Sequence, residues 1–304
     1  MKKFPSLLAA LLLLPAIFLR AEINVVATTA DLGSLAQTVG GAHVTVTTLA
    51  RPTEDPHFVD ARPSFIRILH QADLLVEGGA ELEQGWLPAL VNNARNAKIL
   101  PGAPGNFRAA AGLQLLEIPA VLDRSQGDVH AFGNPHFLLD PRNASRVAQN
   151  LAESLARLDP PHAADYRENA EEFRKMIAEE FPRWQARLAP FKGAPVVTYH
   201  KSYDYLLAAF GLELAGTIEP KPGIEPSSAH LETLASDMQA RGVKVILAEP
   251  NRPDRLCHFL ARASGATLLR LPLVPDKSAG CADYRSLVET HVTTLEKTLR
   301  SRGK

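Results

Sequence analysis

The sequence predicts an α/β protein of two lobes, each a mostly parallel sheet with flanking helices, joined by one long rigid α-helix. Strand-like and helix-like segments alternate early in the chain, a stretch rich in Ala, Glu and Arg at residues 161–188 reads as one helix, and the alternation then restarts. The expected boundaries are residues 22–160 for the first lobe, 161–188 for the connecting helix and 189–304 for the second lobe.

The first 21 residues predict a secretory signal peptide. Two lysines precede an apolar run of about 15 residues, and the small residue Ala21 follows at the expected cleavage site. The run is short and contains Pro15, which argues against a membrane span. No cysteine lies near Ala21 to carry a lipid. We therefore expect an exported, soluble, periplasmic protein without a lipid anchor.

The first lobe alternates short apolar runs with helical patterns. The run at residues 22–30 is β-branched and reads as a buried parallel strand. Asp140 and Pro141 suit the N-cap and first position of a helix. Further strands are expected at residues 43–50 and 73–79, and helices at 32–40, from 63 onward and at 140–159.

The connecting segment begins with Pro161, which favours a helix start. A continuous helix over residues 161–188 would be roughly 40 Å long, at about 1.5 Å per residue. Pro182 is expected to kink or break it near its end. A helix of this length is better suited to joining two lobes than to a place inside one compact domain.

The second lobe repeats the same alternation and contains no tandem repeat. Strands are expected at residues 194–200, 243–250 and 266–274, and helices at 201–211, 226–242, 252–265 and 283–301. Ser227 or Ser228 suits the N-cap of the second of these helices.

Composition narrows the possible partners and the redox chemistry. The formal net charge is zero and no basic block occurs, which argues against a nucleic-acid partner. Cys257 and Cys281 are the two cysteines, and in an exported chain they predict a disulfide worth ~3 kcal/mol. The alternative, a pair of thiolate metal ligands, would favour a closer spacing such as C-x-x-C.

Three of the ten histidines lie at strand ends or in the loops that follow: His57, His136 and His200. Ligands of open α/β sheets gather at the carboxyl ends of strands, so a cleft between the lobes would bring these side chains together. Imidazole is a favoured ligand of zinc and other late first-row metals. The sequence therefore predicts a metal site between the lobes.

Zinc usually takes four ligands, so a donor from the second lobe is expected. Asp276 is the first choice and Asp283 the second, although Asp276 could instead cap a helix or turn. His130 could capture metal, support a ligand or lie at the surface. Asp55 and Glu249 could steady ligands through hydrogen bonds. The remaining histidines are expected not to be ligands: His43, His70, His162, His230, His258 and His291.

Several motifs follow one another over nearly the whole chain: DPHFVDARPS, GNPHFLLDP, VVTYHKSYDYLLAAFGL, GIEPSSAHLETL and VILAEP. With these motifs the chain resembles the metal-binding solute receptors of ABC importers, the cluster A-I group that serves zinc and manganese. The resemblance implies two α/β lobes, a rigid connecting helix and a metal in the cleft. It places His57, His136 and His200 at the first three ligand positions and Asp276 near the fourth.

The resemblance also implies a function. We expect a high-affinity periplasmic receptor, a monomer and not an enzyme, that carries Zn2+ to an ABC permease. Relatives that bind manganese or iron usually have a carboxylate at the position of His200, so zinc is favoured over Mn2+. The loop over residues 107–130 lacks the many histidines of numerous zinc receptors and offers only His130. The alternatives are a manganese or iron receptor, a secreted zinc hydrolase, although no H-E-x-x-H motif occurs, and an adhesion protein.

Overall fold

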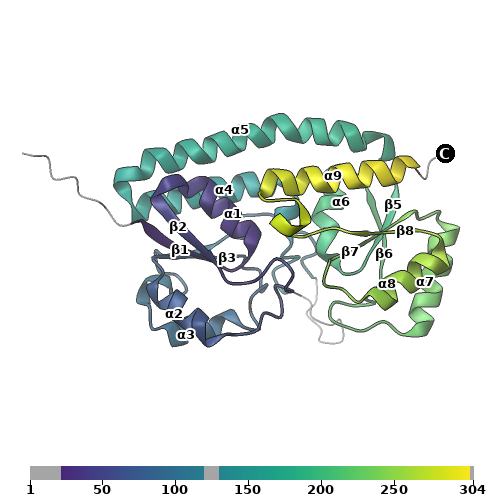
Figure 1. Ribbon diagram of the computed structural model, residues 1–304, viewed down its shortest axis with the longest axis horizontal. Coiled ribbons are helices and arrows are strands. Elements are labelled where there is room, and N and C mark those ends of the chain that lie inside the picture. The colour runs from purple at the N-terminus through teal and green to yellow at the C-terminus, as the bar shows by residue number, and fades with distance from the viewer. Residues whose placement is uncertain (1–21, 120–129, 302–304) are drawn as a thin grey trace, which may run out of the picture.

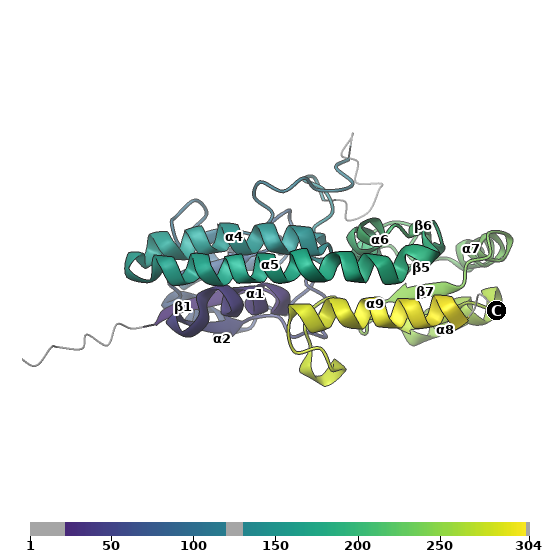
Figure 2. The ribbon, with the colours of Figure 1, turned by 90° about the horizontal axis from the view of Figure 1, so that it is seen from above.

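The computed structural model describes residues 22–119 and 130–301 and has the predicted two-lobed α/β architecture (Figure 1). The predicted signal peptide, residues 1–21, lies outside the described residues. The two lobes lie side by side, and the long helix α5 (Ala163–Leu188) runs along both of them (Figure 2). Within the described ranges, no helix has both the length and the apolar composition of a bilayer-crossing segment.

The first sheet has the strand order β2-β1-β3-β4, and every neighbouring pair is parallel. Helices α1 and α4 pack on one face and α2 and α3 on the other, so the central strands are apolar on both sides. The strands are β1 (Ile23–Ala27), β2 (Val44–Thr48), β3 (Leu74–Glu77) and β4 (Asn106–Arg108), and the helices α1 (Ala30–Gly40), α2 (Pro63–Gln71), α3 (Leu87–Ala94) and α4 (Pro141–Leu158).

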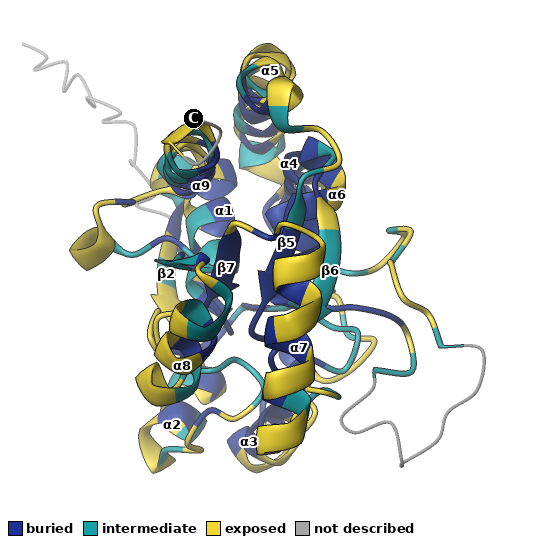
Figure 3. Cartoon of the chain, turned by 90° about the vertical axis from the view of Figure 1, so that its right-hand side faces the viewer, coloured by how far each residue is buried: buried dark blue, intermediate teal, exposed yellow. Residues whose placement is uncertain are grey.

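The second sheet repeats this connectivity in the order β6-β5-β7-β8, again all parallel. Helices α6 and α9 cover one face, and α7 and α8 cover the other with their outer sides exposed (Figure 3). The strands are β5 (Pro195–Thr198), β6 (Glu213–Thr217), β7 (Val245–Ala248) and β8 (Thr267–Arg270), and the helices α6 (Asp204–Phe210), α7 (Ser228–Ala240), α8 (Asp254–Ser264) and α9 (Tyr284–Ser301).

Strands β4 and β6 have no counterpart among the predicted elements. Both lie at a sheet edge, where one side of the strand has no neighbour. Strand β4 has three residues, and β6 is half-buried without a strong apolar run. Edge strands of this kind carry a weak sequence signal because few of their side chains enter the core.

Helix α5 confirms the predicted connector but not the predicted break. Pro182 lies inside the helix, which continues to Leu188. The proline removes one backbone hydrogen bond, and the surrounding packing holds the helix together. Tyr166, Phe173 and Trp184 are buried along α5, in one apolar cluster that runs through both lobes. This shared core is the physical basis of a rigid connection.

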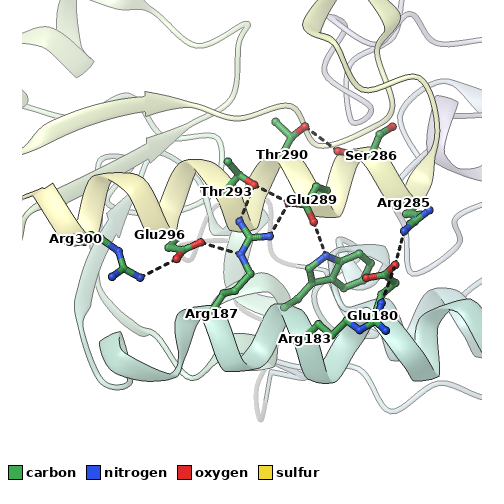
Figure 4. A network of polar contacts seen from close by, with 11 residues as sticks. Glu180, Arg183, Arg187, Arg285, Ser286, Glu289, Thr290, Thr293, Glu296 and Arg300 are labelled. Carbon is green, nitrogen blue, oxygen red and sulfur yellow. Dashed lines mark hydrogen bonds and ion pairs between the residues drawn. The ribbon is translucent and has the colours of Figure 1, made fainter.

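Polar contacts also join α5 to α9 (Figure 4). The Arg187 guanidinium donates to Glu289 at 2.6 Å and to Glu296 at 2.8 Å, and the Trp184 indole donates to Glu289 at 2.8 Å. Exposed ion pairs contribute only ~0–1 kcal/mol each, so they orient the helices, while buried apolar side chains of both helices, including the Phe173–Tyr284 ring pair, pack in one cluster. The connecting helix is therefore fixed to the second lobe as well as to the first.

The predicted disulfide is not formed, and both cysteines are buried free thiols. Cys257 lies on α8 and packs beneath the second sheet. Cys281 precedes α9, lies outside the cluster that contains Cys257, and pairs with Asp276 in an isolated bridge. The two thiols are therefore buried in different surroundings. Burial raises the pKa of both, which makes them poor nucleophiles.

Candidate metal centre

Three predicted histidines, His57, His136 and His200, converge between the lobes. His57 follows β2, His136 is the N-cap of the 3-10 helix η4 (Phe137–Leu139), and His200 follows β5 directly. Their possible ligand atoms all lie within 4.8 Å of one another. In the described part of the chain, no other set of three such side chains meets this spacing.

The geometry of the triad suits a single small cation. The Nε2 atoms of His57 and His136 are 3.2 Å apart. Two nitrogens bound tetrahedrally to zinc at ~2.05 Å would lie about 3.3 Å apart, close to this spacing. The ring planes of the three pairs are inclined by 73°, 73° and 85°. Steeply inclined rings can aim one nitrogen each at a common point, whereas rings stacked face to face cannot.

The two first-lobe histidines are fixed by side chains two residues earlier. The backbone N–H of His57 donates to Asp55 Oδ1 at 3.0 Å, and that of His136 donates to Asn134 Oδ1 at 3.0 Å. Turns of this kind hold a loop in one conformation without regular secondary structure. Asn134 also donates to the Lys201 carbonyl at 2.8 Å, which connects this loop to the second lobe.

The second-lobe histidine is held through its ring. His200 is buried, and its Nδ1 lies 2.8 Å from Glu219 Oε2. A carboxylate at Nδ1 fixes the tautomer and leaves Nε2 for a metal. Glu219 is absent from the predicted set because it follows the unpredicted edge strand β6. A polar residue just after a strand, at the sheet edge where ligands gather, is the sequence feature that could have identified Glu219.

The two carboxylates predicted to support the histidines, Asp55 and Glu249, have different contacts in the structure. Asp55 contacts a ligand histidine, as described above. Glu249 is buried but contacts none of the three histidines, and instead accepts a hydrogen bond from Ser202 and faces Arg252 at 3.3 Å. Glu219 therefore performs the part that was expected of Glu249.

Burial lowers the pKa of both His57 and His136 well below the usual imidazole range. Neighbouring imidazoles and Arg252 add to this effect, because positive charge nearby disfavours a further proton. Both side chains are consequently neutral near neutral pH. Neutral imidazole is the form that binds metal, so the site needs to release no proton from these rings.

Neither carboxylate expected as a fourth ligand joins the triad. Asp276 accepts from Ser278 N at 2.8 Å and caps the 3-10 helix η8 (Lys277–Ala279), which is the alternative role considered for it. Asp283 accepts from Ser286 N at 2.8 Å near the start of α9. Each carboxylate uses its Oδ1 atom for capping, and these hydrogen bonds lower the pKa of each.

His130 lies closer to the triad than either aspartate. Its ring stacks on that of His57, with centroids 5.0 Å apart and planes inclined by 27°. A cavity of about 210 Å³ is lined by His130, His136 and His200, and a smaller one of about 60 Å³ reaches His57 and His136 from the other side. The site therefore adjoins space on two sides.

The sequence profile of the family described as zinc-uptake complex component A, periplasmic (ZnuA) matches residues 25–298. The chain belongs to the ZnuA family. This agrees with the resemblance inferred from the motifs, and the proteins of this family are transport receptors rather than enzymes.

Individual relatives are distant. The chain is similar to the high-affinity zinc uptake system protein ZnuA of Brucella abortus (strain 2308), with 28% identity over 165 residues, which cover 54% of this chain and 49% of that protein. The chain thus spans about half the length of the curated relatives it matches.

Two solved structures share the fold. A crystal structure of ZnuA superposes with a TM-score of 0.76 at 22% identity, covering 91% of this chain and 99% of that one. A manganese-bound mutant of the periplasmic metal binding protein from Candidatus Liberibacter asiaticus gives a TM-score of 0.75 at 23% identity, covering 91% and 100%.

Proposed function

We propose that this protein is an exported periplasmic receptor that binds one Zn2+ through His57, His136 and His200 and delivers it to the permease of an ABC importer. The observation that carries the proposal is the convergence of three imidazoles from two lobes, with ligand atoms within 4.8 Å of one another. Membership of a zinc-uptake family supports the same cargo.

Zinc is favoured over manganese by the donor set. Three imidazole nitrogens suit zinc, whereas Mn2+ favours carboxylate, carbonyl and water oxygens. The carboxylates closest to the triad, Asp55 and Glu219, are engaged by Arg252 and by hydrogen bonds to the histidine residues. A manganese receptor remains the second candidate, because a structural neighbour holds manganese on the same fold.

Binding is favoured over catalysis. A zinc hydrolase needs a general base beside the metal-bound water. The same engagement of Asp55 and Glu219 occupies the carboxylates that could serve as that base. We therefore propose a carrier of zinc and not an enzyme.

The mouth of the site offers apolar side chains to a partner. Phe58 is 68% exposed and lines a small cavity with His57 and His200, and Ile224 is 47% exposed next to Gly223, which lines the same cavity from the second lobe. Exposed apolar groups around a binding site are typical of interaction surfaces. We propose that a single copy of the receptor meets the permease with this face.

Elemental analysis of protein purified from the periplasm tests the proposal, together with equilibrium competition between zinc and manganese. We expect one zinc per chain and preference for zinc, lost in His57→Ala and retained in His258→Ala. His258 is an exposed histidine on α8 and serves as the matched control. Protein that holds no zinc, or variants that behave alike, would refute the assignment.

A further inference from the structure

Arg252 occupies a mostly buried position between the lobes, in the loop that follows β7, and its side chain is 17% exposed. Three carboxylates surround its guanidinium. Asp55 of the first lobe lies 3.2 Å from Nη2, Glu219 lies 3.5 Å from Nη1, and Glu249 lies 3.3 Å from Nε. The guanidinium also lies over the Tyr199 ring, 5.1 Å from its centroid.

Two of these carboxylates have one oxygen on Arg252 and the other on a ligand histidine. Asp55 faces Arg252 with Oδ2 and accepts from the His57 backbone with Oδ1. Glu219 faces Arg252 with Oε1 and meets the His200 ring with Oε2. The contacts form one continuous chain of polar contacts across the cleft, which runs His57–Asp55–Arg252–Glu219–His200. The two links to Arg252 are ion pairs, and the link to His57 is a hydrogen bond from its backbone N–H.

We propose that Arg252 is a positioning residue that couples the ligand histidines of the two lobes and thereby controls how long the receptor retains its metal. The proposal rests on the assignment of the triad as the zinc site. Through this chain of polar contacts, Arg252 holds the His57 loop and the His200 ring at metal-binding separation before the ion arrives. An ordered site avoids the entropic cost of assembling its ligands on binding.

Charge supports this role. Three carboxylates face one guanidinium, so acidic groups outnumber the basic one in this cluster. Imidazole binds a metal in its uncharged form, and these carboxylates place negative charge for a divalent cation in the next layer out. Loss of Arg252 would leave buried carboxylates unpaired and repelling one another, which separates the lobes at this point.

The guanidinium is suited to this position by its shape. Nε, Nη1 and Nη2 each form an ion pair with a different carboxylate, a distribution that the flat, delocalised charge of a guanidinium allows even though Nε has no hydrogen-bond partner among the described residues. A lysine ammonium is a single point of charge and cannot span all three groups. Arg252→Lys should therefore restore the charge but only part of the geometry.

The zinc dissociation rate, measured by stopped-flow transfer to a fluorescent chelator, tests the proposal. We expect zinc to leave Arg252→Gln about 10- to 100-fold faster than wild type, the range for loss of groups behind metal ligands, and to leave Arg252→Lys at an intermediate rate. Arg270→Gln is the matched control. Arg270 donates to the backbone carbonyl of Glu249 and to the Asp254 side chain, both within the second lobe, so zinc should leave this variant at the wild-type rate. An unchanged rate in Arg252→Gln would overturn the proposal.

Amide hydrogen exchange of the zinc-free wild-type and variant proteins tests whether Arg252 orders the site before metal binds. We expect faster exchange over residues 51–58 in Arg252→Gln, with α9 unchanged. Equal acceleration throughout the molecule would indicate a general structural role and overturn the positioning role. Wild-type protein that binds no zinc would refute the proposed function, whereas wild-type binding with unchanged exchange in Arg252→Gln would refute only the role of Arg252.

Discussion

The two lobes share one strand order and each places a buried glutamate near the end of its third strand, yet they use that carboxylate differently. Glu83 of the first lobe accepts from Thr28 Oγ1 at 2.6 Å and from the backbone of Gly78 at 2.7 Å. Among the described residues it forms no ion pair. Glu249 of the second lobe faces Arg252 within the polar cluster behind the metal ligands.

The same fold therefore uses a buried glutamate to stabilise a turn in one lobe and to build the polar cluster beside the histidines in the other. Glu83 holds the turn after β3, where Ala80 and Glu81 have positive φ angles of 50° and 65°, a conformation that few non-glycine residues adopt. In the first lobe the residues after β3 stabilise the turn, and His57 and His136 lie in loops. The second lobe presents His200 directly at a strand end and surrounds it with charge.

Removal of the second-lobe ligand should have the largest effect. His200→Ala deletes a donor itself, so zinc affinity should fall by more than the about 10- to 100-fold that loss of an outer partner costs. Competition with a chelator of known affinity measures the loss. His230→Ala is the control, since His230 bonds to the Thr217 carbonyl of the same lobe. Retained affinity in His200→Ala would exclude a site shared between the lobes.

The buried carboxyl of Glu83 in the first lobe should make the free energy of unfolding depend on pH. Burial raises the pKa of Glu83 to about 7, so between pH 4.5 and 7 the folded state holds more protons than the unfolded state. Glu83 therefore contributes a fall in the free energy of unfolding of on the order of 3 kcal/mol as pH rises through this window.

Glu83→Gln should remove this contribution, because the amide stays neutral at every pH in the window, and should leave the contribution of Asp204, whose pKa burial raises to about 8. Urea unfolding of the metal-free protein between pH 5 and 8 measures it. The exposed Glu232→Gln on α7 should keep the wild-type slope. If Glu83→Gln also kept it, the buried carboxyl would not be the group that titrates.

Loss of the residue that supports a histidine should weaken zinc binding more in the second lobe than in the first. Glu219→Gln removes the negative charge behind the His200 ring and should weaken zinc binding about 10- to 100-fold. Asn134→Ala should cost less, since Asn134 contacts the backbone of His136 and not its ring. The same competition titration compares them. Equal losses would contradict the view that the second lobe controls its ligand more tightly.

The predictable part of the fold was the part whose side chains enter the core. The apolar runs of β1, β5 and β7 identify buried parallel strands, and the alternation predicts both lobes. Edge strands β4 and β6 contribute few core side chains and leave little pattern. Pro182 removes one hydrogen bond, but the packing of α5 against both lobes is not visible in local sequence.

The predictable part of the site was its ligand chemistry. His57, His136 and His200 stand out because each lies at a strand end or in a Pro-rich loop. Asp276 does not join the three histidines, and an aspartate after a strand is equally suited to capping. Glu219 is absent from the prediction, because its role depends on which strand lies beside β5. Sequence thus indicated which histidines come together, and the partners behind them required the fold.

The smallest expected effect concerns His130, whose role the sequence left open. Its ring stacks on His57 and does not share the triad's common point. A stacked ring pair contributes ~0.5–1.5 kcal/mol, so His130→Ala should weaken zinc binding about 2- to 10-fold. The same titration measures this change. A loss as large as that of His200→Ala would make His130 the fourth ligand, and the first lobe would then supply three of the four donors.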